Sequence, residues 1–282
     1  MNAIPPVRRK MLGAALRRYR ENVGYTIEDA ARLLECDRSK VSRIETGQRG
    51  IRPKELRELL AEYGADEGDS QALQAIAGRR GARGWWEEYA DVLPEPFRDY
   101  VVLEAAAMHV LVYDSQQVPG LLQTEDYARA LACADPAATA TVQDRIVQAA
   151  LARQQAVLAG EYPVLRVVIG EGALRQQAGG AAVMRAQIGR LAAISENSVQ
   201  ITIQVLPFAV GAHPGLGTGP AAVLSFGQTV GLGVVHLAGL SGGVFLDGQD
   251  DVACYTRTFV RLQSSALPPA ETARLLRRLA TE

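Results

Sequence analysis

The 282-residue sequence contains only three cysteines, Cys36, Cys133 and Cys254, and only three histidines. The cysteines lie far apart and form no C-x-x-C pair, so neither a disulfide framework nor a zinc site is indicated, and buried thiols are expected. No histidine has a second metal ligand at helical spacing, so no metal site is predicted. The sequence has no apolar run of about 18 residues, and its N-terminus is too basic and broken for a signal peptide. We therefore expect a cytoplasmic, nucleoid-associated protein without a membrane-spanning helix.

Charge is unevenly distributed, although the formal net charge is only −1. Residues 1–65 carry 14 Lys and Arg against 9 Asp and Glu, a net charge of +5, whereas the rest carries 16 against 22, a net charge of −6. Basic residues clustered around one motif are the electrostatic signature of a nucleic-acid-binding module. The length suits two domains, one small and one of ordinary size.

Residues 24–48, GYTIEDAARLLECDRSKVSRIETGQ, predict two short helices joined by a tight turn. Thr26 is suited to cap the first helix together with Asp29, and Asp37 is suited to cap the second. Apolar residues recur at helical spacing in both helices, so each has one buried face. The other face of the second helix carries cationic and small hydrogen-bonding side chains that suit phosphates and base edges: Arg38, Ser39, Lys40, Ser42 and Arg43.

This stretch resembles the XRE-type helix-turn-helix of phage Cro and repressor proteins. The matching residues are Leu12-Gly13, Leu16-Arg17, Gly24, Thr26, Ala30, Leu33, Ser39, Ser42, Glu45 and Gly47. The resemblance implies binding to double-stranded DNA, and we assign the contacts to Thr26, Arg38, Ser39, Lys40, Ser42, Arg43, Arg49 and Arg17. Two residues depart from the family pattern. Ile27 replaces a backbone-contacting Gln, and Glu35 replaces a left-handed Gly, which costs roughly 1 kcal/mol.

Around this motif the sequence predicts further helices at 8–22, from Pro53 to Gly64, and at 70–77. The segment GRRGARG at 78–84 has the composition of a hinge. We therefore expect a helix-turn-helix domain at 1–65, a connecting helix and hinge at 66–84, and a second domain at 85–282. Basic residues that flank the motif, among them Arg8 and Arg20, are expected to add to its DNA-facing charge.

The second domain mixes helical and strand patterns. Helices are expected at about 124–134, 141–159, 180–195 and 269–280, and strands at 165–170, 199–208, 221–226 and 233–237. Alternation of Val199, Ile201, Ile203 and Val205 with polar residues predicts a half-buried strand. The predicted fold is α+β overall, with an all-α N-terminal domain followed by a mixed α+β C-terminal domain.

From Trp85 onward the chain resembles the uncharacterised C-terminal domain of actinobacterial XRE regulators of the WhiJ-like, antitoxin-like kind. The matching segments are 118–124, 127–129, 153–154, Glu171 with 174–175, and 205–208 with Gly211 and His213. At 233–239 the sequence GVVHLAG lacks the Tyr-Leu-Glu found in relatives. The resemblance implies a small protein partner encoded nearby and roles in development and antibiotic production.

Several patterns with chemical potential have simpler structural interpretations. Residues 239–243 match the G-x-S-x-G nucleophile pattern around Ser241, but VFLDG follows in place of a helix, which favours a hairpin. The glycine-rich loop at 215–219 lacks a phosphate-binding Lys. His109 and His236 lie in apolar runs typical of core positions. Neither a catalytic residue nor a cofactor is predicted.

Four other residues are candidates for a ligand or partner pocket: Arg145, Arg153, Glu171 and His213. The first three are ionisable groups in apolar surroundings, which indicates internal pairing or a pocket lining. Internal pairing is the better interpretation.

The leading hypothesis is a sequence-specific DNA-binding regulator that acts as a homodimer on two half-sites, modulated through its C-terminal domain. An alternative is an antitoxin-like module that sequesters a small partner and binds DNA for autoregulation. A third is a repressor gated by a small molecule in a C-terminal cavity. An enzyme ranks last.

Overall fold

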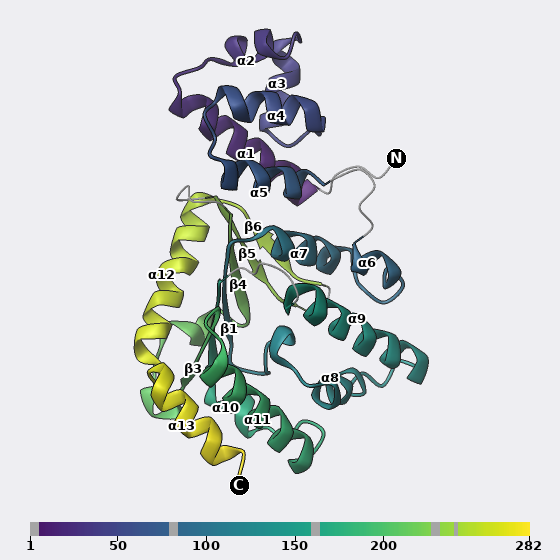
Figure 1. Cartoon of the computed structure of the whole chain (residues 1–282), viewed down its shortest axis with the longest axis vertical. Coiled ribbons are helices and arrows are strands. Elements are labelled where there is room, and N and C mark those ends of the chain that lie inside the picture. The colour runs from purple at the N-terminus through teal and green to yellow at the C-terminus, as the bar shows by residue number, and fades with distance from the viewer. Residues whose placement is uncertain (1–5, 79–83, 159–163, 227–231, 240–241) are drawn as a thin grey trace.

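The computed structural model describes residues 6–78, 84–158, 164–226, 232–239 and 242–282. Its N-terminal part is a compact group of helices, and its larger C-terminal part consists of helices around a six-stranded sheet (Figure 1). This is the α+β architecture that the sequence predicts. Among the described residues, no helix combines the length and apolar character needed to cross a membrane.

The N-terminal helices are α1 Pro6–Asn22, α2 Ile27–Leu33, α3 Arg38–Glu45, α4 Pro53–Glu62 and α5 Glu67–Ala77. The predicted caps are confirmed. Thr26 and Asp29 form a reciprocal capping box at the start of α2, and the Asp37 carboxylate accepts the backbone N–H of Ser39 at 2.7 Å. These hydrogen bonds lower the pKa of Asp29 and of Asp37 below the usual range. The two caps therefore fix where both helices of the motif begin.

Close approach of α1 and α3 depends on two glycines of the motif. A Cβ at Gly13 would lie 2.4 Å from the Ile44 carbonyl oxygen, so no larger residue fits between the two helices. Gly47 follows α3 with a φ of +71°, and a Cβ there would lie 2.8 Å from the backbone of Lys10. The Leu-Gly and Glu-x-Gly elements of the motif thus serve helix packing.

The turn between α2 and α3 contains backbone strain at Glu35. Its φ is +46°, and it is the one non-glycine residue with positive φ within the described parts of the chain. The prediction of a left-handed residue at this position is confirmed. A side chain in this region costs roughly 1 kcal/mol relative to glycine.

Helix α5, expected as part of the connecting segment, packs against α1 and α4 and buries Leu73 and Ile76 completely. The buried Asp69 accepts a hydrogen bond from the hydroxyl of Tyr19 in α1. Most of the predicted hinge, residues 79–83, lies outside the described residues.

The sheet has the strand order β3-β2-β1-β4-β5-β6. Its strands are β1 His109–Asp114, β2 Val164–Gly170, β3 Ile201–Leu206, β4 Ala221–Ser225, β5 Gly233–Leu237 and β6 Val244–Leu246. Strands β1, β2 and β3 are parallel, and β4, β5 and β6 continue from β1 as an antiparallel series. One half of the sheet is therefore built from crossovers and the other from hairpin-type pairing.

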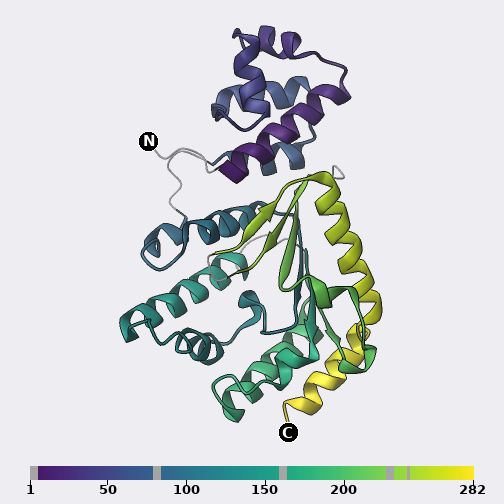
Figure 2. The same ribbon diagram turned by 180° about the vertical axis from the view of Figure 1, so that it is seen from behind.

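The helices of this part are α6 Trp85–Glu88, α7 Glu95–Ala106, α8 Glu125–Ala132, α9 Ala140–Leu158, α10 Glu171–Arg175, α11 Ala181–Asn197, α12 Gln249–Ser265 and α13 Pro269–Leu279, with 3-10 turns η1 Gly120–Leu122, η2 Phe208–Val210 and η3 Pro214–Gly217. Both parallel crossovers advance in the same direction, so right-handed connections place their helices on one face of the sheet. Helix α12 covers the other face, where Phe259 and Leu262 pack with Tyr113 and Val168 (Figure 2).

Coverage of both faces corrects the prediction of a half-buried strand. Strand β3 begins only at Ile201, and Val199 is 98% exposed. Gln204, expected on the solvent side, is buried, because its amide donates to the carbonyls of Gln263 and Leu267 at the end of α12. Helices α7 and α12 and strand β1 were not expected from the sequence.

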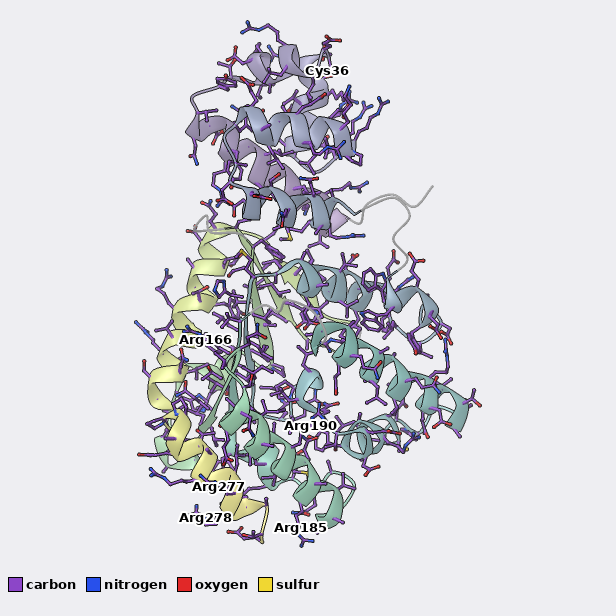
Figure 3. The ribbon with its side chains drawn as sticks, in the orientation of Figure 1. Cys36, Arg166, Arg185, Arg190, Arg277 and Arg278 are labelled. Carbon is purple, nitrogen blue, oxygen red and sulfur yellow. The ribbon has the colours of Figure 1, made fainter. Side chains whose placement is uncertain are left out.

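Two further expectations were wrong. Cys133 and Cys254 are exposed, and Cys36, in the turn of the helix-turn-helix (Figure 3), is only partly buried. His109 begins β1 at an exposed position, because it lies at the open end of the sheet. His236 is buried as predicted, with Nε2 3.2 Å from the Gly242 carbonyl oxygen.

Candidate functional site

Helix α3 presents a polar face to solvent on the side of the helical domain that lies away from the sheet (Figure 1). Val41 and Ile44 are buried against the other helices, whereas Arg38, Ser39 and Arg43 are exposed. Arg43 folds back along α3, where its Nε donates to the Ser39 carbonyl at 3.1 Å. The solvent face of α3 therefore offers guanidinium and hydroxyl donors at the positions expected from the sequence.

The remaining α3 residues are less available. Lys40 forms an ion pair of 2.7 Å with Glu55 of α4, and only 18% of its side chain is exposed. Burial acts to raise the pKa of Glu55, but hydrogen bonds from Lys40 and the backbone of Arg52 outweigh it and lower the pKa. Ser42 is half-buried. Lys40 thus ties α3 to α4, and its ammonium group is not directed freely to solvent.

The other assigned residues surround this face. Thr26 is exposed, but its hydroxyl accepts the N–H of Asp29 at 3.1 Å as part of the helix cap. Arg17 is exposed on α1 and pairs with Glu21 at 2.8 Å. Arg49 is exposed just after α3, and its backbone N–H donates to the Arg43 carbonyl at 2.9 Å.

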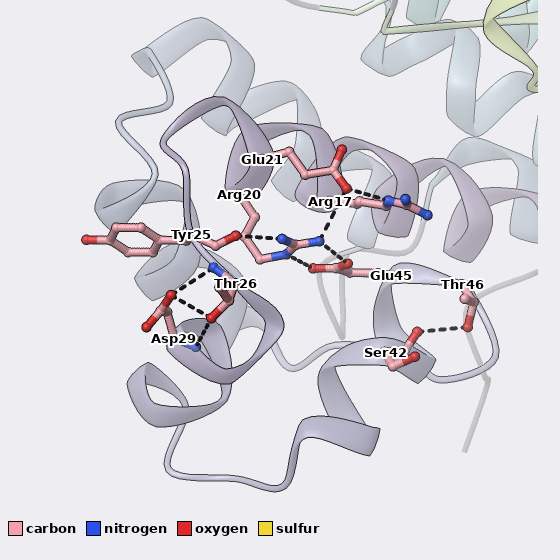
Figure 4. Close-up of polar contacts among 9 residues, drawn as sticks. All are labelled: Arg17, Arg20, Glu21, Tyr25, Thr26, Asp29, Ser42, Glu45 and Thr46. Atoms are coloured by element: carbon pink, nitrogen blue, oxygen red, sulfur yellow. Dashed lines mark hydrogen bonds and ion pairs between the residues drawn. The ribbon is translucent and has the colours of Figure 1, made fainter.

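Arg20 has a structural position, contrary to the expectation that it adds to the DNA-facing charge. It is 6% exposed and forms a bidentate pair with Glu45, with distances of 2.7 and 3.0 Å. Its third nitrogen donates to the Tyr25 carbonyl at 2.6 Å (Figure 4). These bonds join α1, the entry to α2 and the end of α3, so the pair sets the orientation of the exposed helix. Arg8 is also directed inward, toward Asp99 of α7 at 3.6 Å.

Arginines of the C-terminal part do not extend this basic face. Arg185, Arg190, Arg277 and Arg278 gather around α11 and α13, at the end of the molecule opposite the helix-turn-helix (Figure 3). Arg277 pairs there with Glu196 at 2.8 Å.

The four candidate pocket residues do not form one site. Each of the three ionisable groups has an internal partner, as the pairing interpretation predicts. Arg145 binds Asp91 at 2.9 Å, Arg153 binds Glu104 at 2.7 Å, and Glu171 binds Arg175 at 2.8 Å. His213 lies elsewhere, in a shallow surface hollow beside Val260 of α12.

Arg153 lines an internal space that we call the C-terminal cavity, with a volume of about 120 Å³. Its floor is one row of the sheet, in which Val167, Val112, Ala222 and His236 are register partners on neighbouring strands. Its roof consists of α7, α9 and the loop that leads into η1. Three apolar side chains and His236 thus form the floor of a space beneath a roof that carries the Arg153–Glu104 pair.

The roof contains a buried ion pair between aromatic rings. Glu104 is 1% exposed, accepts both contacts from Arg153 at 2.7 and 2.8 Å, and accepts the Tyr100 hydroxyl at 3.0 Å. The Arg153 guanidinium lies 5.3 Å from the ring centres of both Phe97 and Tyr100. Burial acts to lower the pKa of Arg153, but the Glu104 carboxylate raises it above the usual range. Burial lowers the pKa of His236, which disfavours a positive charge on its ring.

The G-x-S-x-G segment lies between β5 and β6. Strands β5 and β6 on either side of it are antiparallel neighbours, so the segment connects a hairpin as predicted. Ser241 itself lies outside the described residues. No group of three or more potential metal ligands gathers within the described ranges.

Glu104, Asp114 and the helix that carries Glu104 were not predicted from the sequence. Nothing local marks these residues, because their environments are created by elements distant in sequence. Helix α12, in contrast, could have been found, since Val252, Tyr255, Phe259 and Leu262 recur at helical spacing.

Family comparisons match both parts of the chain. A family described as a helix-turn-helix domain matches residues 11–73, and a family described as a domain of unknown function, DUF5753, matches residues 97–278. Neither description names an enzymatic activity. Comparisons with curated proteins and with solved structures gave no match. The chain therefore belongs to the DUF5753 family and carries an N-terminal helix-turn-helix domain, the type of domain that binds DNA.

Proposed function

We propose that the protein is a sequence-specific DNA-binding transcription regulator of the XRE type, in which α3 enters the major groove. The observation that carries this proposal is the solvent face of α3, where Arg38, Ser39 and Arg43 are exposed while Val41 and Ile44 anchor the helix. Arg can bind guanine through two hydrogen bonds, and Ser can bind bases or phosphates. The Glu28 carboxylate that pairs with Arg38 at 3.0 Å is exposed, so DNA can replace it at low cost.

Residues around α3 would provide affinity for DNA that does not depend on the base sequence. Arg17 and Arg49 are exposed on either side of α3, and Thr26 lies at the N-terminus of α2, where a phosphate would interact favourably with the helix dipole. Lys40 would contribute less to DNA affinity, because it is paired with Glu55. Packing of α5 against α1 and α4 supports including α5 in the DNA-binding domain.

The test is footprinting of the full-length protein on its own promoter region at two salt concentrations. Arg43→Ala should remove the footprint, with a loss of about 1–3 kcal/mol at the contacted base pair. Arg185→Ala, on α11 far from α3, is the matched control and should leave the footprint unchanged. Binding that is weak, salt-sensitive and equal for wild type and Arg43→Ala would refute specific recognition.

We further propose that the protein binds as a homodimer on two half-sites about one helical turn apart, because one helix-turn-helix buries little DNA surface. We propose that the C-terminal domain modulates this binding through α7. Asp99 of α7 pairs with Arg8 of α1, while Tyr100 and Glu104 of the same helix line the C-terminal cavity. A ligand or protein partner that shifts α7 would therefore change how the helix-turn-helix is held.

A second candidate function is protein sequestration of the antitoxin-like kind. It is favoured by large apolar side chains exposed on the C-terminal domain: Phe208 at 65%, Leu216 at 72% and Val260 at 53%. Helix α12 and η3 contact each other, so Val260 and Leu216 lie on neighbouring elements. Copurification of a small protein that is lost in Val260→Glu would support this function. A monodisperse protein with no partner, unchanged by Val260→Glu, would argue against it.

A further inference from the structure

The C-terminal cavity contains one buried carboxylate without a cationic partner, Asp114. This residue ends β1, and because side chains alternate along a strand it lies on the same face as Val112, which forms the cavity floor. It is only 5% exposed. The backbone N–H groups of Gln116 and Gln117 donate to its Oδ1 at 2.8 and 3.1 Å, and within the described ranges no basic side chain pairs with it.

Asp114 is the one ionisable group of the described cavity lining that has neither an ionic partner nor an aromatic neighbour. Arg153 and Glu104 neutralise each other, and both carboxylate oxygens of Glu104 are already bonded. Burial lowers the pKa of His236, so a positive charge on its ring is disfavoured. Burial raises the pKa of Asp114, although hydrogen bonds from Gln116 and Gln117 act to lower it. A cation beside Asp114 would favour its ionised form, and no described side chain supplies one.

We propose that the C-terminal cavity binds a compact organic cation, a primary amine whose ammonium group pairs with Asp114 and whose apolar body contacts the aromatic roof. The walls suit such a ligand, because Phe97 and Tyr100 on the roof and Val112 and Ala222 on the floor give apolar contact on both sides. An ammonium group that binds a buried carboxylate forms a charge-assisted hydrogen bond, which is about twice as strong as a neutral one.

The volume limits the ligand to about the size of one ring with a short arm. Cavities of about 150 Å³ lined by apolar residues hold benzene. The C-terminal cavity measures about 120 Å³, and its lining includes the exposed residues Gln117 and Ala238. A ligand can therefore enter from the surface with part of its arm outside. The binding itself does not depend on DNA, and only its regulatory consequence rests on the proposed function.

The experiment measures binding of benzylamine, benzyl alcohol and benzoate to the full-length protein by isothermal titration calorimetry without DNA. These probes share a ring and differ in charge. Benzylamine should bind at least about tenfold more tightly than benzyl alcohol, as expected for a charge-assisted hydrogen bond, and benzoate should bind most weakly. Asp114→Asn should reduce the tenfold preference to near one. Asp126→Asn, an exposed aspartate on α8, is the matched control and should preserve it.

A second variant keeps the test decisive if Asp114→Asn does not fold. Ala238→Phe places a ring at one exposed edge of the cavity lining and should weaken binding of all three probes without changing a buried position. Equal binding of benzylamine and benzyl alcohol by the wild type would overturn the proposal, as would tight benzoate binding. Benzylamine affinity that is unchanged in Ala238→Phe would place the ligand elsewhere and overturn it too. Failure here would leave the footprinting result, and thus the proposed function, unaffected.

Discussion

Removal of the Glu45 charge should destabilise the helix-turn-helix more than any exposed substitution around it. Glu45→Gln preserves the shape of the side chain but leaves Arg20, which is 6% exposed, without its bidentate partner. Breaking a buried ion pair by removing one partner typically costs 3–5 kcal/mol. The Tyr25 carbonyl still accepts from Arg20 at 2.6 Å, and Glu21 lies 3.5 Å away, so we expect about 3 kcal/mol, the lower end of that range.

The assay is urea unfolding of the full chain, monitored by hydrogen exchange. Peptides from residues 10–50 report the stability of the N-terminal domain separately from that of the sheet. Arg17→Ala is the control, because it removes an exposed pair with Glu21 and should cost less than about 0.5 kcal/mol. The double variant Arg20→Met with Glu45→Leu should recover most of the loss, since apolar residues can replace a buried pair.

The relative losses of unfolding free energy in these variants test whether the buried pair stabilises the domain. A loss for Glu45→Gln no larger than that for Arg17→Ala would refute the structural role of the buried pair. A double variant as unstable as Glu45→Gln would show that the cost does not come from the uncompensated charge of Arg20. In either case, the orientation of α3 would have to depend on its apolar contacts alone.

Three other predictions follow from single sites. Glu35→Gly should stabilise the domain by roughly 1 kcal/mol in urea unfolding, because it relieves the left-handed backbone; a loss of stability would contradict this. Burial raises the pKa of Asp99 from 3.8 to about 6, so the folded state, in which α7 packs against α1, binds a proton between about pH 4 and 6 and becomes more stable as pH falls. Hydrogen exchange of α7 should show this pH dependence of stability, which amounts to up to about 3 kcal/mol, and Asp99→Asn should flatten it. A maleimide reagent should modify Cys133 and Cys254 in the native protein faster than Cys36, and equal rates would contradict their exposure.

The helix-turn-helix could be predicted in detail because its determinants are local. The caps at Thr26 and Asp37 lie within three residues of the groups they bind, and the strained turn at Glu35 was implied by the resemblance to the helix-turn-helix family. Local signals also gave β2, β4, β5, α9 and α13, whose apolar patterns are long or strongly periodic. Their arrangement into one sheet, in contrast, depends on pairing between distant strands.

Helix α7 escaped prediction because its charged residues are buried by partners far away in sequence. Glu104 depends on Arg153, which is 49 positions away, and Asp99 depends on Arg8 in the other domain. A pattern of apolar residues cannot identify a buried face that contains paired charges. Gln204 was misassigned for the same reason, because the α12 carbonyls that satisfy its amide are not visible locally.

A substitution in α7 can test whether ligand binding and its regulatory effect are separable. Asp99 faces α1, whereas its neighbour Tyr100 faces the cavity, so the two functions lie on different sides of α7. Coupling between two sites requires a shared element whose position both sites influence. Asp99→Asn should therefore preserve benzylamine affinity while reducing any effect of benzylamine on DNA affinity. By reciprocity, DNA must then change benzylamine affinity by the same reduced factor. Full coupling in Asp99→Asn would show that the signal reaches α1 by another route, such as the contact between α5 and α7.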